Sequence, residues 1–322
     1  MKFSNVYIEK EIKNSTITLK ILRKIKYNKI IICDKYSEVF NPKNQNFRIQ
    51  KKNPSIILAQ KKKNILFKTP PKFTIGFKKN YYFSHMLNCI YDCKYCFLQG
   101  MLNSANYLLF INYNDFFKEI KKIIKNNLQE KICFFSGYDC DSLALEKVTN
   151  FSLNFIDFFK KYKNAFLEIR TKSINISELI KIEPTENVIV AYSINPQIII
   201  KEYEPKTPNF NARLNSLKKI QDYGWSIGLR FDPIFITEKN QKIYFNFLEK
   251  IFKLLDSSLI HSITIGKFRM PKTYFKKIIK IRPEDTFQFN SLIQKSDEEN
   301  QMIKLFYKQL QNYVDKKKIF LN

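Results

Sequence analysis

The sequence lacks the features of a membrane-spanning or secreted protein. No apolar run in the 322-residue chain approaches the roughly 20 residues that a membrane-spanning helix needs. The first 20 residues contain no apolar core of the signal-peptide type. We therefore expect a cytoplasmic protein with no membrane partner, whose cysteines stay reduced.

Ligands for a closed zinc site are also scarce. The chain has six cysteines and two histidines, with no second C-x2-C pair and no H-x3-H motif. A structural zinc ion is normally held by four such ligands. The sequence therefore argues against a zinc-binding domain.

Acidic residues are few beside basic ones. The 29 acidic and 56 basic residues give a formal net charge of +27. A positive charge of this size favours polyanionic partners such as nucleic acid. However, the basic residues are mostly lysines spread along the chain, among many Asn, Ile, Phe and Tyr residues. An AT-rich genome produces this mixture without selection for binding, so both explanations stay open.

Three of the six cysteines lie in one short segment, Cys89-Ile-Tyr-Asp-Cys93-Lys-Tyr-Cys96. Thiolates at C-x3-C-x2-C spacing converge on a common point and suit an iron–sulfur cluster. A [4Fe–4S] cluster normally takes four cysteines, so three leave one iron open to another ligand. A zinc loop or chance spacing is the alternative.

This spacing resembles the signature of the radical S-adenosylmethionine (SAM) superfamily. In that superfamily the open iron takes the amino and carboxylate groups of SAM. Electron transfer from the cluster then breaks SAM into methionine and a 5′-deoxyadenosyl radical. The resemblance implies a [4Fe–4S] cluster on Cys89, Cys93 and Cys96, SAM as a second cofactor, and an external electron donor such as flavodoxin or ferredoxin.

Strand and helix patterns alternate from Phe73 onward. The predicted strands cover 73–77, 132–135, 166–169, 187–193, 225–231 and 260–265. The predicted helices between them cover 116–127, 151–162, 211–223 and 245–255. Such alternation implies parallel βαβ units. We predict an α/β fold, a partial, open (β/α)6-type TIM barrel over residues 73–285, as the superfamily resemblance also implies. Polar residues after each strand would form its catalytic face.

Residues 1–72 are predicted to form a small N-terminal α/β appendage that ends near Pro70-Pro71. A ragged helix is expected over 6–26 and a strand over 29–33. The basic segment 48–52 is interpreted as a solvated charged edge.

Residues 286–322 are predicted to form a C-terminal helical extension. We expect a polar surface loop over 294–300 and a final helix over 301–313.

Longer sequence motifs resemble those of one particular family within this superfamily. The relevant segments are Cys96-Phe-Leu-Gln99, Asp141-Ser-Leu-Ala-Leu-Glu146, Glu168-Ile-Arg-Thr-Lys-Ser173 and Ser193-Ile-Asn195. They resemble the C-Y-L-Q, D-P-L-G-x-E, E-x-R-T-K-S and S-I-N phrases of spore photoproduct lyases. These radical SAM enzymes repair a thymine–thymine adduct in DNA without light. The Q-x-F-R-x-Q-K phrase at 45–51 is similar to that family too, so the resemblance runs over nearly the whole chain.

The resemblance implies a SAM pocket. In the family, the lysine of R-T-K-S and the serine and asparagine of S-x-N lie there, which corresponds to Lys172, Ser193 and Asn195. A lysine suits the methionine carboxylate, and serine and asparagine suit the ammonium or ribose hydroxyls. Ser136, at the end of the predicted strand 132–135, is a further cofactor-binding candidate.

The chain departs from the family at the groups nearest the substrate. The lyases have a cysteine after the second strand, which gives a hydrogen atom to the product radical, and a tyrosine after the third cluster cysteine. Here these positions are Tyr138 and Phe97, while Tyr95 is kept and Cys140 lies two residues beyond Tyr138. Several interpretations stay open. Cys140 takes over as donor, Tyr138 donates and is paired with Tyr95, the scaffold acts on another substrate, or Cys140 is a passive thiol.

The loop after the last predicted strand offers DNA contacts. Lys267, Arg269 and Lys272 are the candidates for binding phosphate. A lesion in a duplex would have to be flipped out to reach a buried radical. We expect a lyase that repairs a thymine–thymine adduct in DNA. The alternatives are the same chemistry on another nucleic acid or a peptide, and a non-catalytic iron–sulfur protein that binds nucleic acid.

Overall fold

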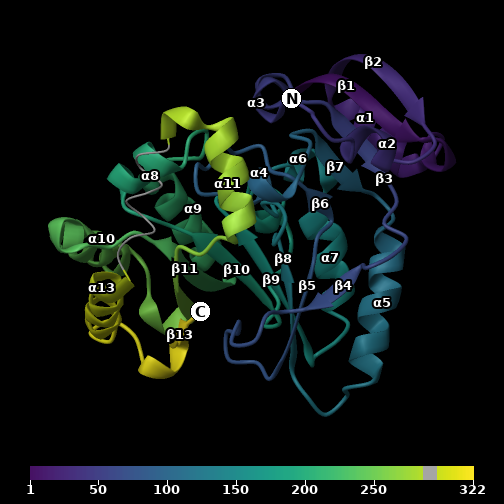
Figure 1. Ribbon diagram of the computed structural model, residues 1–322. Coiled ribbons are helices and arrows are strands. Elements are labelled where there is room, and N and C mark those ends of the chain that lie inside the picture. The colour runs from purple at the N-terminus through teal and green to yellow at the C-terminus, as the bar shows by residue number, and fades with distance from the viewer. Residues whose placement is uncertain (286–295) are drawn as a thin grey trace.

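The computed structural model describes residues 1–285 and 296–322. A curled sheet surrounded by helices carries a second, smaller sheet near one end (Figure 1). Within the described residues, no helix has the length and apolar character required to cross a membrane.

The large sheet has the strand order β13-β12-β11-β10-β9-β8-β5-β4. Its strands are β4 (Leu66–Lys68), β5 (Lys79–Phe83), β8 (Ile132–Ser136), β9 (Ala165–Thr171), β10 (Val188–Ser193), β11 (Ser226–Ile234), β12 (Ile260–Lys267) and β13 (Ile319–Leu321). Neighbours from β5 to β13 are parallel, and β4 is antiparallel to β5. The predicted open (β/α)6 half-barrel is confirmed as β5 and β8 to β12, with one short strand added at each edge.

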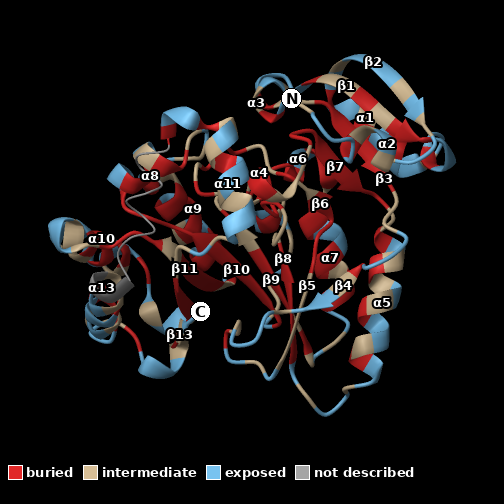
Figure 2. Cartoon of the chain, viewed as in Figure 1, coloured by how far each residue is buried: buried red, intermediate tan, exposed pale blue. Residues whose placement is uncertain are grey.

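Helices cover the outer face of this sheet, and the strands between them are buried (Figure 2). The longer helices are α5 (Tyr113–Lys125), α7 (Phe151–Phe159), α8 (Gln197–Tyr203), α9 (Phe210–Asp222), α10 (Gln241–Leu254), α11 (Lys272–Ile281) and α13 (Ser296–Leu310). Two short ones are α4 (Leu98–Met101) and α6 (Glu146–Thr149). Strands β8 and β10 are buried at every residue, as expected for a parallel sheet covered on both faces.

The appendage contains a second sheet of order β2-β1-β3-β7-β6. Its strands are β1 (Lys2–Glu9), β2 (Lys26–Cys33), β3 (Ile56–Ala59), β6 (Met86–Leu87) and β7 (Tyr107–Phe110), joined by the helices α1 (Thr16–Lys24), α2 (Ser37–Phe40) and α3 (Phe47–Lys52). Two strands therefore come from beyond residue 72, where the sequence placed the boundary, and the division into domains stays a prediction. The cysteine loop leaves β6 and returns through β7, so the appendage sheet anchors both of its ends.

The predicted helix over 6–26 is wrong in its first half. Residues 2–9 form β1, in which Phe3, Val6 and Ile8 are buried. The helix begins only at Thr16, because the Ser15 hydroxyl accepts a hydrogen bond from the Thr18 amide and caps it.

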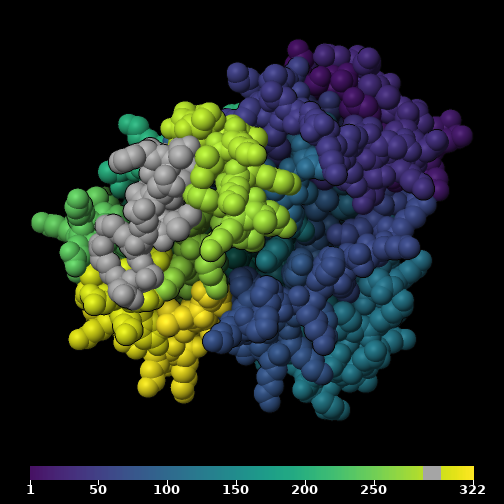
Figure 3. Space-filling view, in the orientation of Figure 1, coloured from purple at the N-terminus to yellow at the C-terminus, as the bar shows by residue number. Residues whose placement is uncertain are grey.

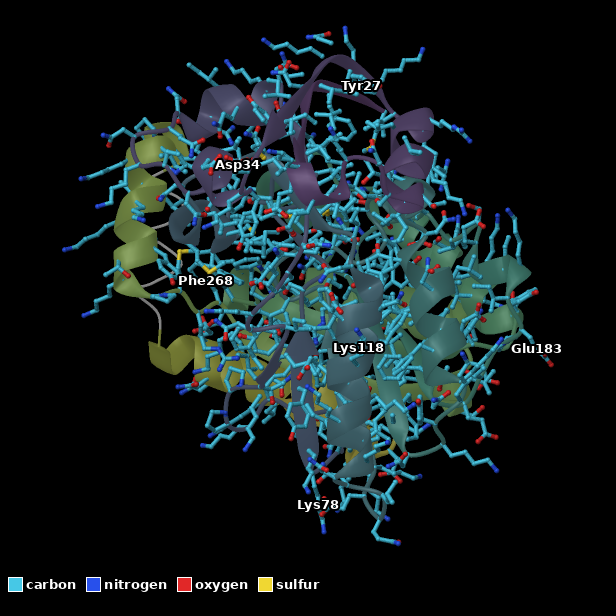
Figure 4. The ribbon with its side chains drawn as sticks, turned by 90° about the vertical axis from the view of Figure 1, so that its right-hand side faces the viewer. Tyr27, Asp34, Lys78, Lys118, Glu183 and Phe268 are labelled. Atoms are coloured by element: carbon cyan, nitrogen blue, oxygen red, sulfur yellow. The ribbon has the colours of Figure 1, made fainter. Side chains whose placement is uncertain are left out.

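The predicted strand over 73–77 is also wrong, because the first barrel strand is β5. Ile75 is buried and packs with Phe135 inside the barrel. The Phe73 ring lies 5.1 Å from that of Phe135, edge to face. These apolar residues fill part of the barrel interior. Lys78, just before β5, lies at the lower tip of the molecule in Figure 4.

The polar loop expected over 294–300 is wrong from Ser296 onward, where α13 begins. Residues 294 and 295 lie outside the described residues. The final helix is therefore α13, which starts five residues earlier than predicted.

Candidate functional site

The carboxyl ends of neighbouring barrel strands bring the predicted cofactor residues to one face. Ser136 ends β8, Lys172 follows β9, Ser193 ends β10 and Asn195 lies two residues beyond. Parallel strands place such residues at the same edge of the sheet. The predicted residues therefore lie at one face of the half-barrel, and the catalytic role of this face stays a prediction.

The cysteine loop lies at this face, between β6 and α4. Its three thiols are free, and the Cys96 amide donates to the Cys93 carbonyl at 3.1 Å in a tight turn. In the part of the chain that the structure describes, no three potential ligands converge on a single metal ion. A [4Fe–4S] cluster binds each thiolate through a different iron, and the loop offers three free thiols for three irons.

The loop is clamped by ion pairs from both sides. Arg282, after α11, donates to the Asp92 carboxylate at 2.5 Å and to Gln99 Oε1 at 2.7 Å. Arg48, in the appendage helix α3, donates to the same Asp92 carboxylate at 2.9 Å. The Lys94 ammonium lies 2.7 Å from Asp285, in the turn after α11. In Figure 3 the yellow-green atoms of the α11 region accordingly lie beside the purple and blue N-terminal atoms.

The interpretation of segment 48–52 as a solvated edge is wrong for Lys51. This lysine is buried, and its ammonium donates a hydrogen bond to the Cys89 carbonyl. It also lies over the Tyr107 ring, 5.4 Å from the centroid. Lys51 follows the buried Phe47 by four residues in α3, and this spacing puts both on one helix face. The spacing of four residues between Phe47 and Lys51 is the sequence signal from which the burial of Lys51 could have been predicted.

A buried charged group adjoins the loop at Glu204. Its carboxylate accepts the Tyr95 hydroxyl at 2.5 Å and the Asn195 amide at 3.1 Å, and it pairs with Arg213 at 2.5 Å. Burial alone would raise the pKa of Glu204, but the positive charges of Arg213 and Lys172 hold the pKa below its usual value. Glu204 is therefore an anion that orients its neighbours.

Lys172 and Asn195 each have a polar group that could bind a ligand. Burial favours a lower pKa for Lys172, but Glu204 and Cys93 attract its charge and raise the pKa above its usual value. Among the described residues, Asn195 Oδ1 is buried and has no hydrogen-bond partner. A cation and a free acceptor thus both lie beside Glu204, where a zwitterionic amino acid group could bind.

Ser136 is held by the protein itself. Its hydroxyl donates to the Glu168 carbonyl at 2.9 Å and lies 2.8 Å from the Ser142 hydroxyl. The next residue, Gly137, has φ +79°, and a Cβ there would lie 2.5 Å from Ser142 Oγ. Ser136 and Gly137 thus form a tight turn that leads to Tyr138, and a role of Ser136 in cofactor binding stays a prediction.

Tyr138 and Cys140 lie in different surroundings. Tyr138 is half-buried, and its ring stacks on Tyr82 at 4.3 Å and lies 5.9 Å from Phe97. Cys140 is buried in an apolar cluster with Met86 and residues of the appendage sheet. Burial, followed by the nearby thiol and carboxyl groups, raises the pKa of Cys140 well above its usual value.

The structure does not pair Tyr138 with Tyr95. The Tyr95 hydroxyl is bonded to Glu204, and its ring contacts Phe235 at 5.4 Å. Tyr82, which the sequence reasoning missed, takes the place beside Tyr138. No local pattern distinguishes Tyr82 from Tyr81, because the position of Tyr82 beside the loop after β8 follows from the pairing of β5 with β8, two segments that are distant in the chain.

The three DNA-contact candidates do not share one environment. Arg269 and Lys272 are exposed, whereas the Lys267 ammonium donates to Asn300 in α13. Phe268, labelled in Figure 4, separates Lys267 from Arg269 in the chain. Its ring lies 6.3 Å from that of Phe235. Two exposed cations therefore flank the catalytic face.

We expect Arg282→Leu to loosen the cysteine loop. It removes a buried donor from Asp92 and Gln99, and loss of the partner of a buried carboxylate costs about 3–5 kcal/mol. Arg48 still contacts Asp92 at 2.9 Å, so we expect the lower part of that range. Iron release to a chelator from the reconstituted protein should be about 10-fold or more faster than in the unsubstituted protein.

Lys280→Leu is the matched control, because Lys280 is an exposed cation on α11. Equal iron release from both variants would show that the clamp does not hold the loop.

Comparison with known proteins agrees with this geometry. The model of the spore photoproduct lyase family matches residues 4–319. The spore photoproduct lyase of Geobacillus sp. is 25% identical over 199 residues, 60% of this chain and 58% of the relative. That of Clostridium acetobutylicum is 26% identical over 206 residues, 63% of this chain and 61% of the relative. The match thus spans under two thirds of these relatives' length.

Solved structures confirm the fold. A cysteine-to-serine variant of spore photoproduct lyase superimposes with a TM-score of 0.84 at 18% identity, covering 99% of this chain and 98% of that one. Spore photoproduct lyase complexed with dinucleoside spore photoproduct gives a TM-score of 0.81 at 18% identity, with the same coverage. Because the family model spans nearly the whole sequence, the chain belongs to the spore photoproduct lyase family.

Proposed function

We propose that this protein is a radical SAM lyase that repairs a thymine–thymine adduct in DNA. The observation that carries the proposal is that Lys172, Asn195 and Glu204 lie beside the three-cysteine loop at the carboxyl face of a half-barrel. Family membership over residues 4–319 supports the same chemistry.

The cofactors are a [4Fe–4S] cluster and SAM, which when bound together supply the 5′-deoxyadenosyl radical. Cys89, Cys93 and Cys96 hold the cluster. A solved spore photoproduct lyase variant contains bound AdoMet, which supports SAM as the second cofactor. The Lys172 ammonium binds the carboxylate of SAM, and the unpaired Asn195 Oδ1 accepts from its ammonium. Ser193, whose carbonyl accepts from Arg213 at 3.1 Å, ends β10 two residues before Asn195 and would contact SAM beside it.

The substrate is a thymine lesion in DNA. A solved relative is complexed with dinucleoside spore photoproduct, and this supports a DNA-derived ligand. The exposed Arg269 and Lys272 would hold phosphates beside the lesion, with Lys267 behind them. The net charge of +27 favours approach to such a polyanion. The lesion would leave the duplex to reach the buried site.

Tyr138 is the hydrogen-atom donor that the geometry favours over Cys140. Tyr138 is half-buried and its ring lies 5.9 Å from that of Phe97 beside the cysteine loop, whereas Cys140 is buried and packs in the apolar cluster of the appendage sheet. An electron donor of the flavodoxin or ferredoxin class would reduce the cluster in the cytoplasm, where free thiols persist.

Anaerobic reconstitution with iron and sulfide, followed by addition of SAM, a reductant and a spore-photoproduct dinucleotide, tests the proposal. We expect thymidylyl-thymidine and 5′-deoxyadenosine to form together. Formation of 5′-deoxyadenosine with the lesion intact would keep the radical chemistry but overturn the substrate. Absence of both, with the cluster assembled, would overturn the proposed enzyme.

A further inference from the structure

Four aromatic rings form a continuous column beside the cysteine loop. Phe97, next to the ligand Cys96, lies 5.9 Å from Tyr138, and Tyr138 stacks on Tyr82 at 4.3 Å with the two ring planes 29° apart. Tyr82 in turn stacks on Phe67 at 5.2 Å. Phe67 is 37% exposed, so the column runs from the loop to the surface.

The two central members of the column are phenols. Phe97 and Phe67 have no hydroxyl, so neither can supply a hydrogen atom. Among the ring contacts of the described residues, Tyr82 is the phenol that touches Tyr138. Tyr95 is engaged elsewhere, because its hydroxyl is bonded to Glu204.

The barrel strand β5 determines which tyrosine faces the site. Successive side chains of a strand point to opposite faces. Tyr82 packs with Phe135 inside the barrel, whereas Tyr81 stacks on Phe134 at 5.7 Å on the helix-covered side. Tyr82, and not Tyr81, therefore lies on the face of β5 that contacts Tyr138.

A carboxyl group lies close to both phenols. Asp139 accepts a hydrogen bond from the Ser84 hydroxyl at 2.6 Å. After burial, the charge of Asp139 is the next cause that raises the pKa of both Tyr82 and Tyr138. Both tyrosines thus remain protonated at neutral pH and hold a hydrogen to give.

We propose that Tyr138 and Tyr82 form a two-residue hydrogen relay, in which Tyr138 reduces the product radical and Tyr82 then restores Tyr138. This inference rests on the proposed lyase function and deepens it by naming a second catalytic tyrosine.

The Tyr138 O–H bond breaks and a C–H bond forms on the substrate-centred radical, leaving a Tyr138 phenoxyl radical. An electron crosses the stacked rings from Tyr82 and a proton follows to the Tyr138 oxygen, so that Tyr138 is reduced and Tyr82 oxidised. One electron from the flavodoxin- or ferredoxin-class donor and one proton from water return Tyr82 to the phenol.

Tyr82→Phe tests the relay in the reconstituted holoenzyme, with Tyr81→Phe as the matched control. Both substitutions remove one hydroxyl from the same strand and keep the ring. We expect Tyr82→Phe to complete its first turnover within about 2-fold of the control and to lose about 10-fold or more in later turnovers. The first-turnover measurement also shows that the variant is folded.

The spectrum of the radical trapped during turnover distinguishes a catalytic role of Tyr82 from a purely structural one. Trifluorotyrosine placed at position 82 keeps the hydroxyl, and we expect it to change the hyperfine pattern of the radical trapped during turnover, whereas the same residue at position 81 should not. Equal later turnovers in the two phenylalanine variants, or an unchanged radical spectrum with trifluorotyrosine at 82, would overturn the relay. Failure of the unsubstituted protein to repair the dinucleotide would instead overturn the lyase function on which it rests.

Discussion

Replacing Cys93 by alanine is expected to abolish SAM cleavage. Cys93 is the central ligand candidate of the loop and is buried beside Lys172 and Glu204. An alanine offers no ligand to iron, and two cysteines from one loop cannot hold a [4Fe–4S] cluster that normally takes four protein ligands. We expect formation of 5′-deoxyadenosine to fall by at least about 1000-fold, equivalent to about 4 kcal/mol of barrier. Anaerobic chromatography of the products measures this.

Cys33→Ala is the matched control for this substitution. Cys33 is a free, partly exposed cysteine at the end of β2, outside the loop. Its variant should keep iron content and activity, and both variants should bind a DNA oligonucleotide equally. Normal iron content in Cys93→Ala would contradict the assignment of the cluster. Unchanged DNA binding together with no SAM cleavage in the unsubstituted protein would favour a non-catalytic binding protein.

The site could be read from the sequence where its residues are close in the chain. The C-x3-C-x2-C spacing identifies the loop without any knowledge of the fold, and strand–helix alternation identifies the half-barrel that carries Lys172 and Asn195. These signals are local, since each depends on a few neighbouring residues.

The missed features depend on contacts between distant segments. Arg282 lies 190 residues from Asp92 in the chain, and their ion pair follows from α11 folding over the cysteine loop. Lys51 looked like part of a solvated edge because its charge is visible in the sequence, whereas its packing against Cys89 is not. The apolar residues 73–77 have the composition of a strand, but a barrel interior needs the same composition.

Arg230→Met is expected to destabilise the barrel strongly. The Arg230 guanidinium pairs with the Glu168 carboxylate at 2.8 and 3.2 Å and donates to the Ser262 carbonyl at 2.8 Å, and both side chains of the ion pair are fully buried. Removing one partner leaves a buried charge, which costs about 3–5 kcal/mol. Arg170 still contacts Glu168 at 2.9 Å, so we expect the lower part of that range. Urea unfolding followed by circular dichroism measures the loss.

Lys160→Met is the control for this loss, because Lys160 and Asp157 form an exposed ion pair on the far end of α7. Its cost should lie between about 0 and 1 kcal/mol. The double substitution Glu168→Leu with Arg230→Met should recover part of the stability, since the carboxylate that lost its partner is then removed as well. A cost for Arg230→Met as small as that of Lys160→Met would contradict a structural role for the buried pair.

The pH dependence of stability gives a second check on the same pair. Burial alone would raise the pKa of Glu168, but Arg230 and then Arg170 bring the pKa below the ordinary value of 4.5. A carboxyl whose pKa is lower in the folded state stabilises the fold above its unfolded pKa and loses that contribution as pH falls. The unfolded pKa of Glu168 is common to both chains, so only its two folded-state pKa values affect their stability difference. In iron-free protein, the stability difference between the unsubstituted chain and Arg230→Met should therefore be constant at neutral pH. It should shrink as falling pH protonates the Glu168 carboxyl, which happens first in the variant that lacks Arg230. A difference that grows towards acid would mean that Glu168 is protonated in the folded protein, and the pair would then be neutral.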